Sequence, residues 1–181
     1  MISNGYIQEQ PIRDLAPRLD AIKIDLKSFT ESFYRDYCRG ELKPVLQTLE
    51  IVKGLGLWLE IVVLIIPTLN DGEVECRDLC RWVKRNLGPE TPVHFTRFHP
   101  MYKLQNLPST PVETLDRNFS IARSEGLYYP YVGNVPGHPG ESTKCRSCGE
   151  TAIERYGYAV RSAMKDGACA RCGEAIHGVW K

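Results

Sequence analysis

Two Cys-x-x-Cys-Gly motifs in the last quarter of the 181-residue chain constrain its fold more than any other feature. They span residues 145–149 and 169–173, with twenty residues between the two cysteine pairs. A Cys-x-x-Cys turn points both sulfurs at one point, and the glycine lets backbone N–H groups approach them. Four thiolates without an open position are what a structural zinc ion takes. Cys145, Cys148, Cys169 and Cys172 therefore predict a zinc ribbon over residues 141–181.

Sulfur ligands alone do not identify the metal, because iron in a rubredoxin-like centre takes the same four thiolates. Two disulfides, or four free thiols, would use the same cysteines without a metal. Cys38, Cys76 and Cys80 have no partner pattern of their own. Cys76 and Cys80 lie four apart on one face of a predicted helix, where we favour buried thiols over a metal site. An odd total of seven cysteines, four of them in a metal pattern, predicts a reducing cytoplasm.

Composition and charge exclude several classes of protein. Apolar residues make up 43% and charged residues 25% of the chain, which are globular values, and the net charge of +1 argues against a broad nucleic-acid or membrane surface. Residues 141–181 carry seven Lys or Arg against five Asp or Glu. A Zn(Cys)4 centre adds about −2, so we expect no nucleic-acid binding there, while a protein partner stays open. We also predict no transmembrane segment and no signal peptide.

Strand and helix patterns alternate as far as residue 132. The expected helices cover residues 10–15, 41–55, 73–87 and 112–125, and the expected strands cover 19–26, 58–66, 92–98 and 128–132. This alternation predicts an α/β fold with a parallel sheet and right-handed crossovers. The nearly all-apolar segment 58–66 predicts a strand buried on both faces. Residues 133–140 are a Gly/Pro linker, so we predict one domain over 1–132 and a second over 141–181.

Polar residues gather where these strands end. Asp25 and Lys27 lie at the end of one strand, Asn70 follows the next, and Arg97 and His99 lie at the end of a third. Parallel α/β sheets place their sites at this edge. Each of these residues also has a non-functional interpretation, which stays open. Asp25 and Lys27 could form a solvated strand face, and Asn70 could cap the following helix. Arg97 could form a salt bridge, and His99 a structural hydrogen bond.

Several segments together resemble the radical S-adenosylmethionine (SAM) superfamily, and most nearly its pyruvate-formate-lyase-activase-like branch, the AmmeMemoRadiSam system enzymes. They are Ser-Asn-Gly-Tyr-Ile at 3–7, Asp-Ala-Ile-Lys-Ile-Asp-Leu-Lys at 20–27, Ile-Ile-Pro-Thr-Leu-Asn-Asp at 65–71, His-Phe-Thr-Arg-Phe-His-Pro-Met-Tyr-Lys at 94–103, and Tyr-Val-Gly-Asn-Val-Pro-Gly at 131–137. The cysteine ribbon also fits that branch, so the resemblance covers essentially the whole chain.

The resemblance implies a partial (βα)6 barrel, of which this chain would be the second half, followed by the zinc-ribbon or rubredoxin-like module. Such enzymes bind SAM and a [4Fe–4S] cluster. They cleave SAM reductively to a 5′-deoxyadenosyl radical, which abstracts hydrogen from a protein or small-molecule substrate. By resemblance, Asn4, Asp25, Asn70 and His99 line the SAM site, and Asp25, Lys27 and His99 serve catalysis.

The chain lacks two motifs of the family. It has no Cys-x-x-x-Cys-x-x-Cys loop to hold the cluster and no Gly-Gly-Glu motif for the SAM amino group. We therefore expect these parts on a missing N-terminal half of the barrel, which would be a partner, and no activity for this chain alone. The alternative is a zinc-ribbon protein-binding module on an α/β scaffold without catalysis. The sequence does not identify the substrate.

Overall fold

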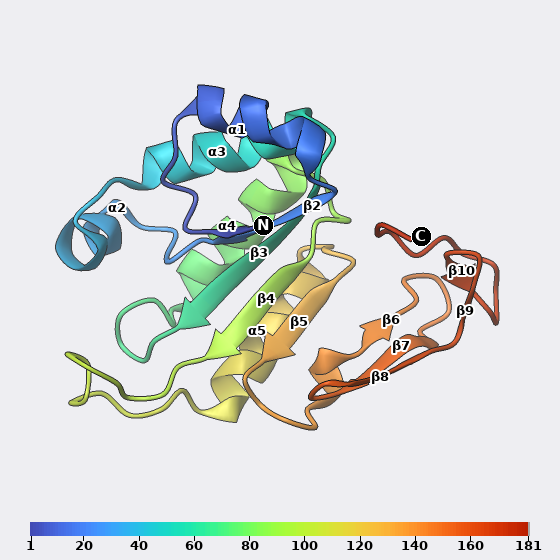
Figure 1. Ribbon diagram of the computed structural model, residues 1–181. Coiled ribbons are helices and arrows are strands. Elements are labelled where there is room, and N and C mark those ends of the chain that lie inside the picture. Colours follow the sequence, from blue (N-terminus) through green and yellow to red (C-terminus); the bar gives the residue numbers. More distant parts are fainter. Residues whose placement is uncertain (181) are drawn as a thin grey trace.

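The computed structural model describes residues 1–180, and its centre is a parallel sheet in which the spatial order of the strands matches the chain order (Figure 1). The five strands of this sheet are β1 (Ile2–Ser3), β2 (Ala21–Asp25), β3 (Trp58–Ile65), β4 (Val93–Arg97) and β5 (Pro130–Gly133). Every neighbouring pair runs parallel. The predicted α/β fold with a parallel sheet is confirmed.

The predicted helices are also present, within about two residues of their expected ends. They are α1 (Glu9–Leu15), α3 (Leu42–Gly54), α4 (Glu73–Asn86) and α5 (Val112–Ser124). A short helix, α2 (Glu31–Phe33), runs directly into a π-helix at Tyr34–Cys38, and sequence analysis missed both. Segments this short show no clear helical period. Within residues 1–180, no helix is long and apolar enough to cross a bilayer.

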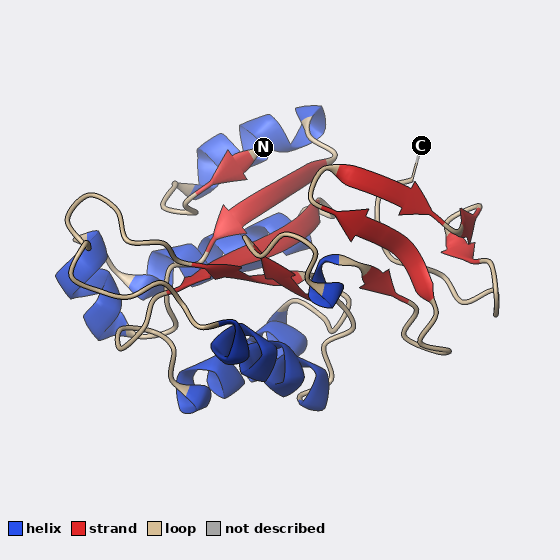
Figure 2. Ribbon diagram, turned by 90° about the horizontal axis from the view of Figure 1, so that it is seen from below, coloured by secondary structure: helices blue, strands red, loops and turns tan. Residues whose placement is uncertain are grey.

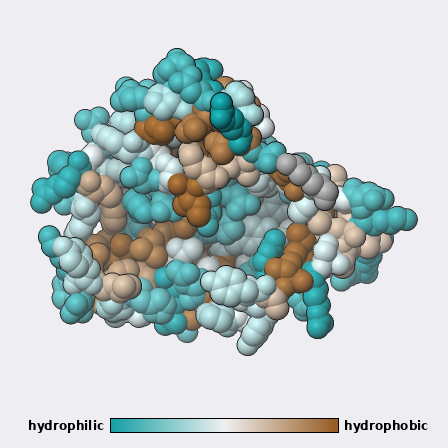
Figure 3. Space-filling view, viewed as in Figure 1, coloured by the Kyte–Doolittle hydropathy of each residue, from teal (hydrophilic) through white to brown (hydrophobic). Residues whose placement is uncertain are grey.

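The two faces of the sheet differ. Helices cover one face, as Figures 1 and 2 show, and the alternate strand residues Ile22, Ile24, Ile61 and Phe95 are buried beneath them. The opposite face carries no helix layer, and Figure 3 shows it as a hollowed surface with hydrophilic side chains. Side chains on this face of β3 are only half-buried, so the prediction of a strand buried on both faces is wrong.

The C-terminal module, residues 141–180, contains two small antiparallel sheets. One consists of β6 (Thr143–Lys144), β7 (Thr151–Tyr156) and β8 (Ala159–Ser162), and the other of β9 (Met164–Lys165) and β10 (Ala168–Cys169). The hydroxyl groups of Tyr131 and Thr143 share a 2.7 Å hydrogen bond that joins this module to β5. The segment before it forms a 3-10 turn, Pro139–Glu141, and the division into domains at 133–140 stays a prediction.

Gly5 offers a test of the packing between β2 and α3. Its φ is +73°, and an added Cβ would lie 2.9 Å from Ile24 Cγ2 and 3.0 Å from Val45 Cγ1. Gly5→Ala combines a left-handed backbone penalty with overpacking, so we expect a loss of about 2–4 kcal/mol in the free energy of unfolding, measured by urea denaturation.

The matched control is Gly56→Ala, because Gly56 has φ +75° but open space around its Cβ position. Only the backbone penalty applies there, so a loss of about 1 kcal/mol is expected. Equal losses for the two variants would contradict the packing argument.

Candidate functional site

The four cysteines of the C-terminal module converge on one point. Their sulfur atoms all lie within 4.8 Å of one another. Cys145 Sγ lies 3.5 Å from Cys172 Sγ, and Cys148 Sγ lies 3.7 Å from Cys169 Sγ. A tetrahedral ion with bonds of about 2.3 Å places its sulfur ligands about 3.8 Å apart, whereas a disulfide needs about 2.05 Å. All four are free cysteines, so the geometry fits one metal ion and not two disulfides.

Backbone hydrogen bonds shape the two motifs in the same way. Cys145 N donates to Glu150 O and Cys169 N to Glu174 O, both at 2.8 Å. The glycines of the motifs, Gly149 and Gly173, have φ values of +74° and +76°. A residue with a side chain would be strained in that conformation. The sequence reason for the tight turns is therefore the glycine that ends each motif.

Ion pairs cross from one motif to the other. Arg171 Nη1 lies 3.0 Å from Glu150 Oε2, and Arg146 Nε lies 2.8 Å from Glu174 Oε1. Arg146 also lies over the ring of Tyr128, 4.7 Å from its centroid, which connects the site to the sheet domain. Sequence analysis missed these pairs, although an arginine within each Cys-x-x-Cys turn and a glutamate after it were the signal. These arginines offset part of the negative charge that four thiolates give a metal centre.

Metal content tests the four-cysteine site. We expect the purified chain to hold about one zinc or iron ion without acid-labile sulfide, and Cys172→Ser to lose it because four ligands are needed for a closed tetrahedral site. Cys38→Ser is the control, since Cys38 is also exposed but lies outside the cluster. Elemental analysis measures both, and a metal-free wild-type chain from metal-replete growth would contradict the assignment.

Asp25 and Lys27 lie at the carboxyl end of β2 and form an ion pair. Lys27 Nζ is 2.9 Å from Asp25 Oδ2, with side-chain exposures of 39% and 33%. A pair this exposed stabilises a fold by at most about 1 kcal/mol, so folding does not require it. Asn4, exposed at the end of β1, accepts a hydrogen bond from Tyr6 N through Oδ1. Asp25 and Lys27 therefore lie at a strand end, as predicted, and Asn4 lies at the end of the neighbouring strand.

A cavity of about 510 Å³ opens beside these strand ends, with Asn4 and Lys27 in its wall. Its aromatic lining comes from Tyr6, Phe33, Tyr34 and Tyr37. Tyr34 OH accepts a hydrogen bond from Lys27 N, and burial raises the pKa of Tyr34 to about 12, so its hydroxyl stays protonated. The α2 and π-helix segment, which sequence analysis missed, supplies much of this wall.

Asn70 is buried, and its side-chain amide forms hydrogen bonds with three backbone groups. Its Oδ1 accepts from Ile66 N at 2.6 Å, while its Nδ2 donates to Lys27 O at 2.8 Å and to Leu64 O at 2.9 Å. Asn70 thereby joins the end of β3 to the segment that carries Lys27. The helix-cap interpretation is wrong, because Gly72 occupies the N-cap position of α4. A role for Asn70 in binding a cofactor stays a prediction.

His99 and Arg97 lie near the end of β4. His99 is exposed, with Nδ1 3.4 Å from Ser109 Oγ. Arg97 Nε donates to Thr110 O at 2.8 Å, and within residues 1–180 it has no carboxylate partner at ion-pair distance. The salt-bridge interpretation of Arg97 is therefore wrong. The predicted catalytic and SAM-binding role of His99 stays a prediction.

Replacing Asn70 tests whether its buried side chain stabilises the fold. Asn70→Ala leaves three backbone partners unpaired, one of them in a buried hydrogen bond and two in part-buried ones, so the free energy of unfolding should fall by about 2–4 kcal/mol, measured by urea denaturation. The control is Asn86→Ala, which removes one exposed hydrogen bond to Trp82 O and should change the free energy by less than about 0.5 kcal/mol. An Asn70→Ala chain as stable as the wild type would contradict this structural role.

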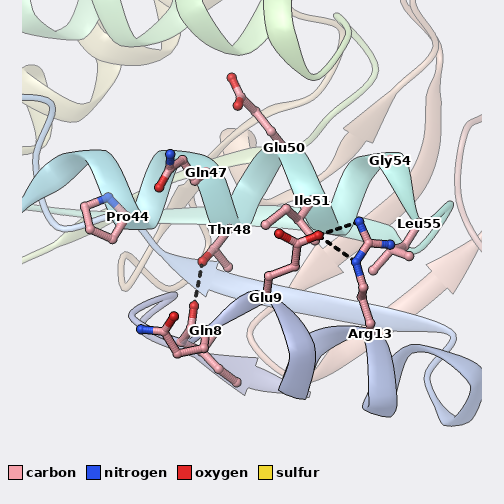
Figure 4. A pocket seen from close by; sticks show the side chains of 11 residues that line it. Gln8, Glu9, Arg13, Pro44, Gln47, Thr48, Glu50, Ile51, Gly54 and Leu55 are labelled. Carbon is pink, nitrogen blue, oxygen red and sulfur yellow. Dashed lines mark hydrogen bonds and ion pairs between the residues drawn. The ribbon is translucent and has the colours of Figure 1, made fainter.

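A groove lies between α1 and α3, away from these residues (Figure 4). It measures about 700 Å³. Glu9 and Arg13 pair with each other along its edge, and Thr48 Oγ1 donates to Ile7 O at 3.4 Å. These groups are already partnered, and the groove contains none of the predicted site residues. We assign it no function.

Sequence comparison finds no family model that matches the chain. An uncharacterized protein of Methanocaldococcus jannaschii is 45% identical over 179 residues, which cover 97% of this chain and 53% of that protein. The chain therefore spans about half the length of this curated relative.

Several solved structures have a similar fold, and one of them is a radical SAM methyltransferase. A domain of pyruvate-formate lyase-activating enzyme from Bacteroides vulgatus superimposes with a TM-score of 0.63 at 14% identity, over 73% of this chain and 79% of that one. A radical SAM methyltransferase from Sphaerobacter thermophilus gives 0.53 at 18% identity, over 77% and 42% of the two chains. The structure of TYW1 with a lysine–pyruvate adduct bound superimposes with a TM-score of 0.51 at 17% identity, over 71% of this chain and 41% of that one. The chain therefore has a radical SAM-like fold.

Proposed function

We propose that this chain is the SAM-binding C-terminal part of a radical SAM enzyme of the activase-like, AmmeMemoRadiSam system branch. The observation that carries the proposal is the Asp25–Lys27 pair, which lies with Asn4 at the carboxyl edge of a parallel sheet on the face without helices. Parallel α/β folds bind ligands at this edge. The radical SAM-like fold and the adjacent 510 Å³ cavity support the same conclusion.

The side chains at this edge match the polar groups of SAM. Lys27 offers an ammonium group for the SAM carboxylate, and Asp25 offers a carboxylate for its amino group or ribose hydroxyls. Asn4 adds an amide that both donates and accepts. Asn70 holds the backbone of Lys27 through its 2.8 Å bond to Lys27 O, so it acts as a positioning residue in this proposal. His99 is proposed to approach SAM from the end of β4.

The residues of this chain do not fit the [4Fe–4S] cluster of a radical SAM enzyme. The sequence holds no Cys-x-x-x-Cys-x-x-Cys loop. Cys38 is exposed on the π-helix, whereas Cys76 and Cys80 are buried in the core on α4. The four cysteines of the C-terminal module surround a space for a single ion, without an open position. We derive no step through a cluster, and we propose that another polypeptide segment supplies it.

Strand β1 is the proposed place for that segment. It is two residues long, and within residues 1–180 it pairs with β2 alone and leaves Ile2 70% exposed. A sheet edge with unpaired backbone groups accepts a further strand. Strand addition here would extend the sheet towards a partial barrel, with the open face as its interior.

The C-terminal module has a second candidate function in binding a protein. The hairpin of β7 and β8 exposes Tyr156, Tyr158 and Val160, with Tyr158 fully exposed. Exposed aromatic residues of this kind anchor protein interfaces. This function needs no SAM and no radical chemistry, which separates it from the first proposal.

Reductive cleavage of SAM tests the proposed function. The chain is combined with the part of the Methanocaldococcus jannaschii relative that it does not span, under anaerobic reducing conditions, and 5′-deoxyadenosine is measured. We expect product from a complex that co-purifies, and at least about a tenfold loss for Asp25→Asn and for Lys27→Met, because each removes a charge-assisted hydrogen bond.

The control is Arg13→Gln, which removes a charge from α1, and Arg13 does not line the proposed cavity. Its product yield should equal that of the wild type. A co-purifying complex that binds iron and sulfide but cleaves no SAM would contradict the proposal and favour the protein-binding function.

A further inference from the structure

Glu60, His94 and Tyr131 form a polar site on the open face that no sequence pattern assigned. They come from β3, β4 and β5. Glu60 Oε2 lies 3.0 Å from His94 Nε2, and the His94 ring stacks on Tyr131 with a centroid distance of 4.8 Å and an interplanar angle of 20°. The side chains of Glu60 and His94 are 35% and 26% exposed, so the pair borders solvent without being free in it.

The Glu60 carboxylate fixes the chemistry of His94. Trp58 Nε1 donates to Glu60 Oε1 at 3.1 Å, so both oxygens of the carboxylate are engaged. Burial by itself would raise the pKa of Glu60, but the hydrogen bond from His94, the charge of His94 when its ring is protonated, the hydrogen bond from Trp58 and the nearby charge of Lys23 lower it below its ordinary value. An ionised carboxylate only accepts, so His94 donates through Nε2. In the neutral imidazole, Nδ1 is then a hydrogen-bond acceptor.

The C-terminal module supplies an unpaired cation to the same place. Arg155 on β7 lies 5.7 Å from the Tyr131 ring centroid, and its Nη1 donates to Glu141 O and to Thr143 Oγ1. Within residues 1–180, no carboxylate lies at ion-pair distance from Arg155, and the hydrogen bonds of its guanidinium group come from Nη1. The nearby Glu141 carboxylate instead accepts from Gly137 N and Gly157 N, both at 3.3 Å.

These groups surround a cavity of about 300 Å³ between the sheet and the C-terminal module. Its lining includes Glu60, His94, Tyr131, Glu141 and Arg155. The volume is at the lower end of the range for small-molecule sites. The groups left without a partner in its wall are a guanidinium edge and an imidazole acceptor.

We propose that this cavity binds a small anion, a carboxylate or a phosphate, through Arg155, with a hydroxyl or N–H group of the same molecule donating to His94 Nδ1. A guanidinium fork matches the oxygen pairs of both anions. Glu60 is a positioning residue, because it holds the His94 ring with Nδ1 as the acceptor. Tyr131 is the apolar wall of the site.

The site faces the same side of the sheet as the proposed SAM edge. Asp25, Val62 and His94 pair in one row across β2, β3 and β4, so His94 lies two strand spacings, or about 10 Å, from Asp25. That the bound anion is the substrate of chemistry at Asp25 rests on the proposed function. Binding of the anion does not, and it can be measured without SAM.

The probes are glycolate, inorganic phosphate and acetate, titrated into the full chain at fixed pH and ionic strength. Long-range proton–nitrogen NMR follows the His94 ring nitrogens, assigned with His94→Gln. We expect glycolate or phosphate to shift the Nδ1 resonance to saturation, and the one that does identifies the anion class. Acetate carries the anion without the donor, so it should bind more weakly.

Variants at Arg155 identify the cation. Arg155→Gln should weaken anion binding by about tenfold or more. The dissociation constant of Arg155→Lys should lie between those of Arg155→Gln and the wild type, because lysine keeps the charge without the planar guanidinium fork. Arg161→Gln, on the exposed strand β8, is the matched control and should leave the dissociation constant unchanged.

Three results would overturn the proposal. They are the absence of a saturable shift with every probe, equal weakening by Arg155→Gln and Arg161→Gln, and acetate binding as tightly as glycolate. Failure of SAM cleavage with anion binding intact would remove only the link to the proposed function.

Discussion

The burial of one face of the parallel sheet beneath α3, α4 and α5 is the interaction on which the rest of the molecule depends. Ile24, Ile61 and Val93 are fully buried at this interface, and fully burying a side chain of this size contributes about 1.5–3 kcal/mol. Because strand residues alternate, the same register that buries this set directs Lys23, Asp25, Glu60 and His94 to the other face. The open polar face is thus a direct consequence of how the core is built.

The C-terminal module depends on its own centre. Its buried cluster contains few residues, and two of them, Cys145 and Cys169, belong to the four-cysteine site. A unit of about 40 residues seldom has enough hydrophobic core to fold without a metal or a disulfide. Metal in this site would therefore order the module, and with it Arg155 and Thr143, which reach back to Tyr131. A structural ion near the C-terminus would in this way set one wall of the cavity on the sheet.

The sequence predicted the features that depend on local pattern and missed those that depend on register. Hydrophobic periodicity located the helices and strands, and the spacing of Cys145, Cys148, Cys169 and Cys172 predicted a convergence that the structure contains. The Glu60–His94 pair could not be predicted in the same way, because it joins residues 34 positions apart on separate strands.

The role of Asn70 shows the same limit. An asparagine after a strand and before a helix suggests a cap, and only the three-dimensional path of the chain shows that its amide reaches Lys27 O and Leu64 O instead. The short α2 and the π-helix after it were invisible for a different reason. Three residues of α-helix are too few to display a helical period. The local signal in the sequence was Thr30, a residue type favoured at the N-cap, and its Oγ1 accepts a hydrogen bond from Phe33 N.

The Asp25–Lys27 and Glu60–His94 pairs contribute little to the stability of the fold. The Asp25–Lys27 pair is about one-third exposed, so water screens it, and its loss costs at most about 1 kcal/mol. The Glu60–His94 pair also borders solvent, while Asn70 and the core residues beneath the helices are buried. The groups that could meet a ligand are therefore those the fold can lose, whereas Asn70, which holds the backbone of Lys27, is buried and is one the fold cannot lose. A substitution at Asp25 or Lys27 changes what the open face can bind while the sheet beneath it stays intact.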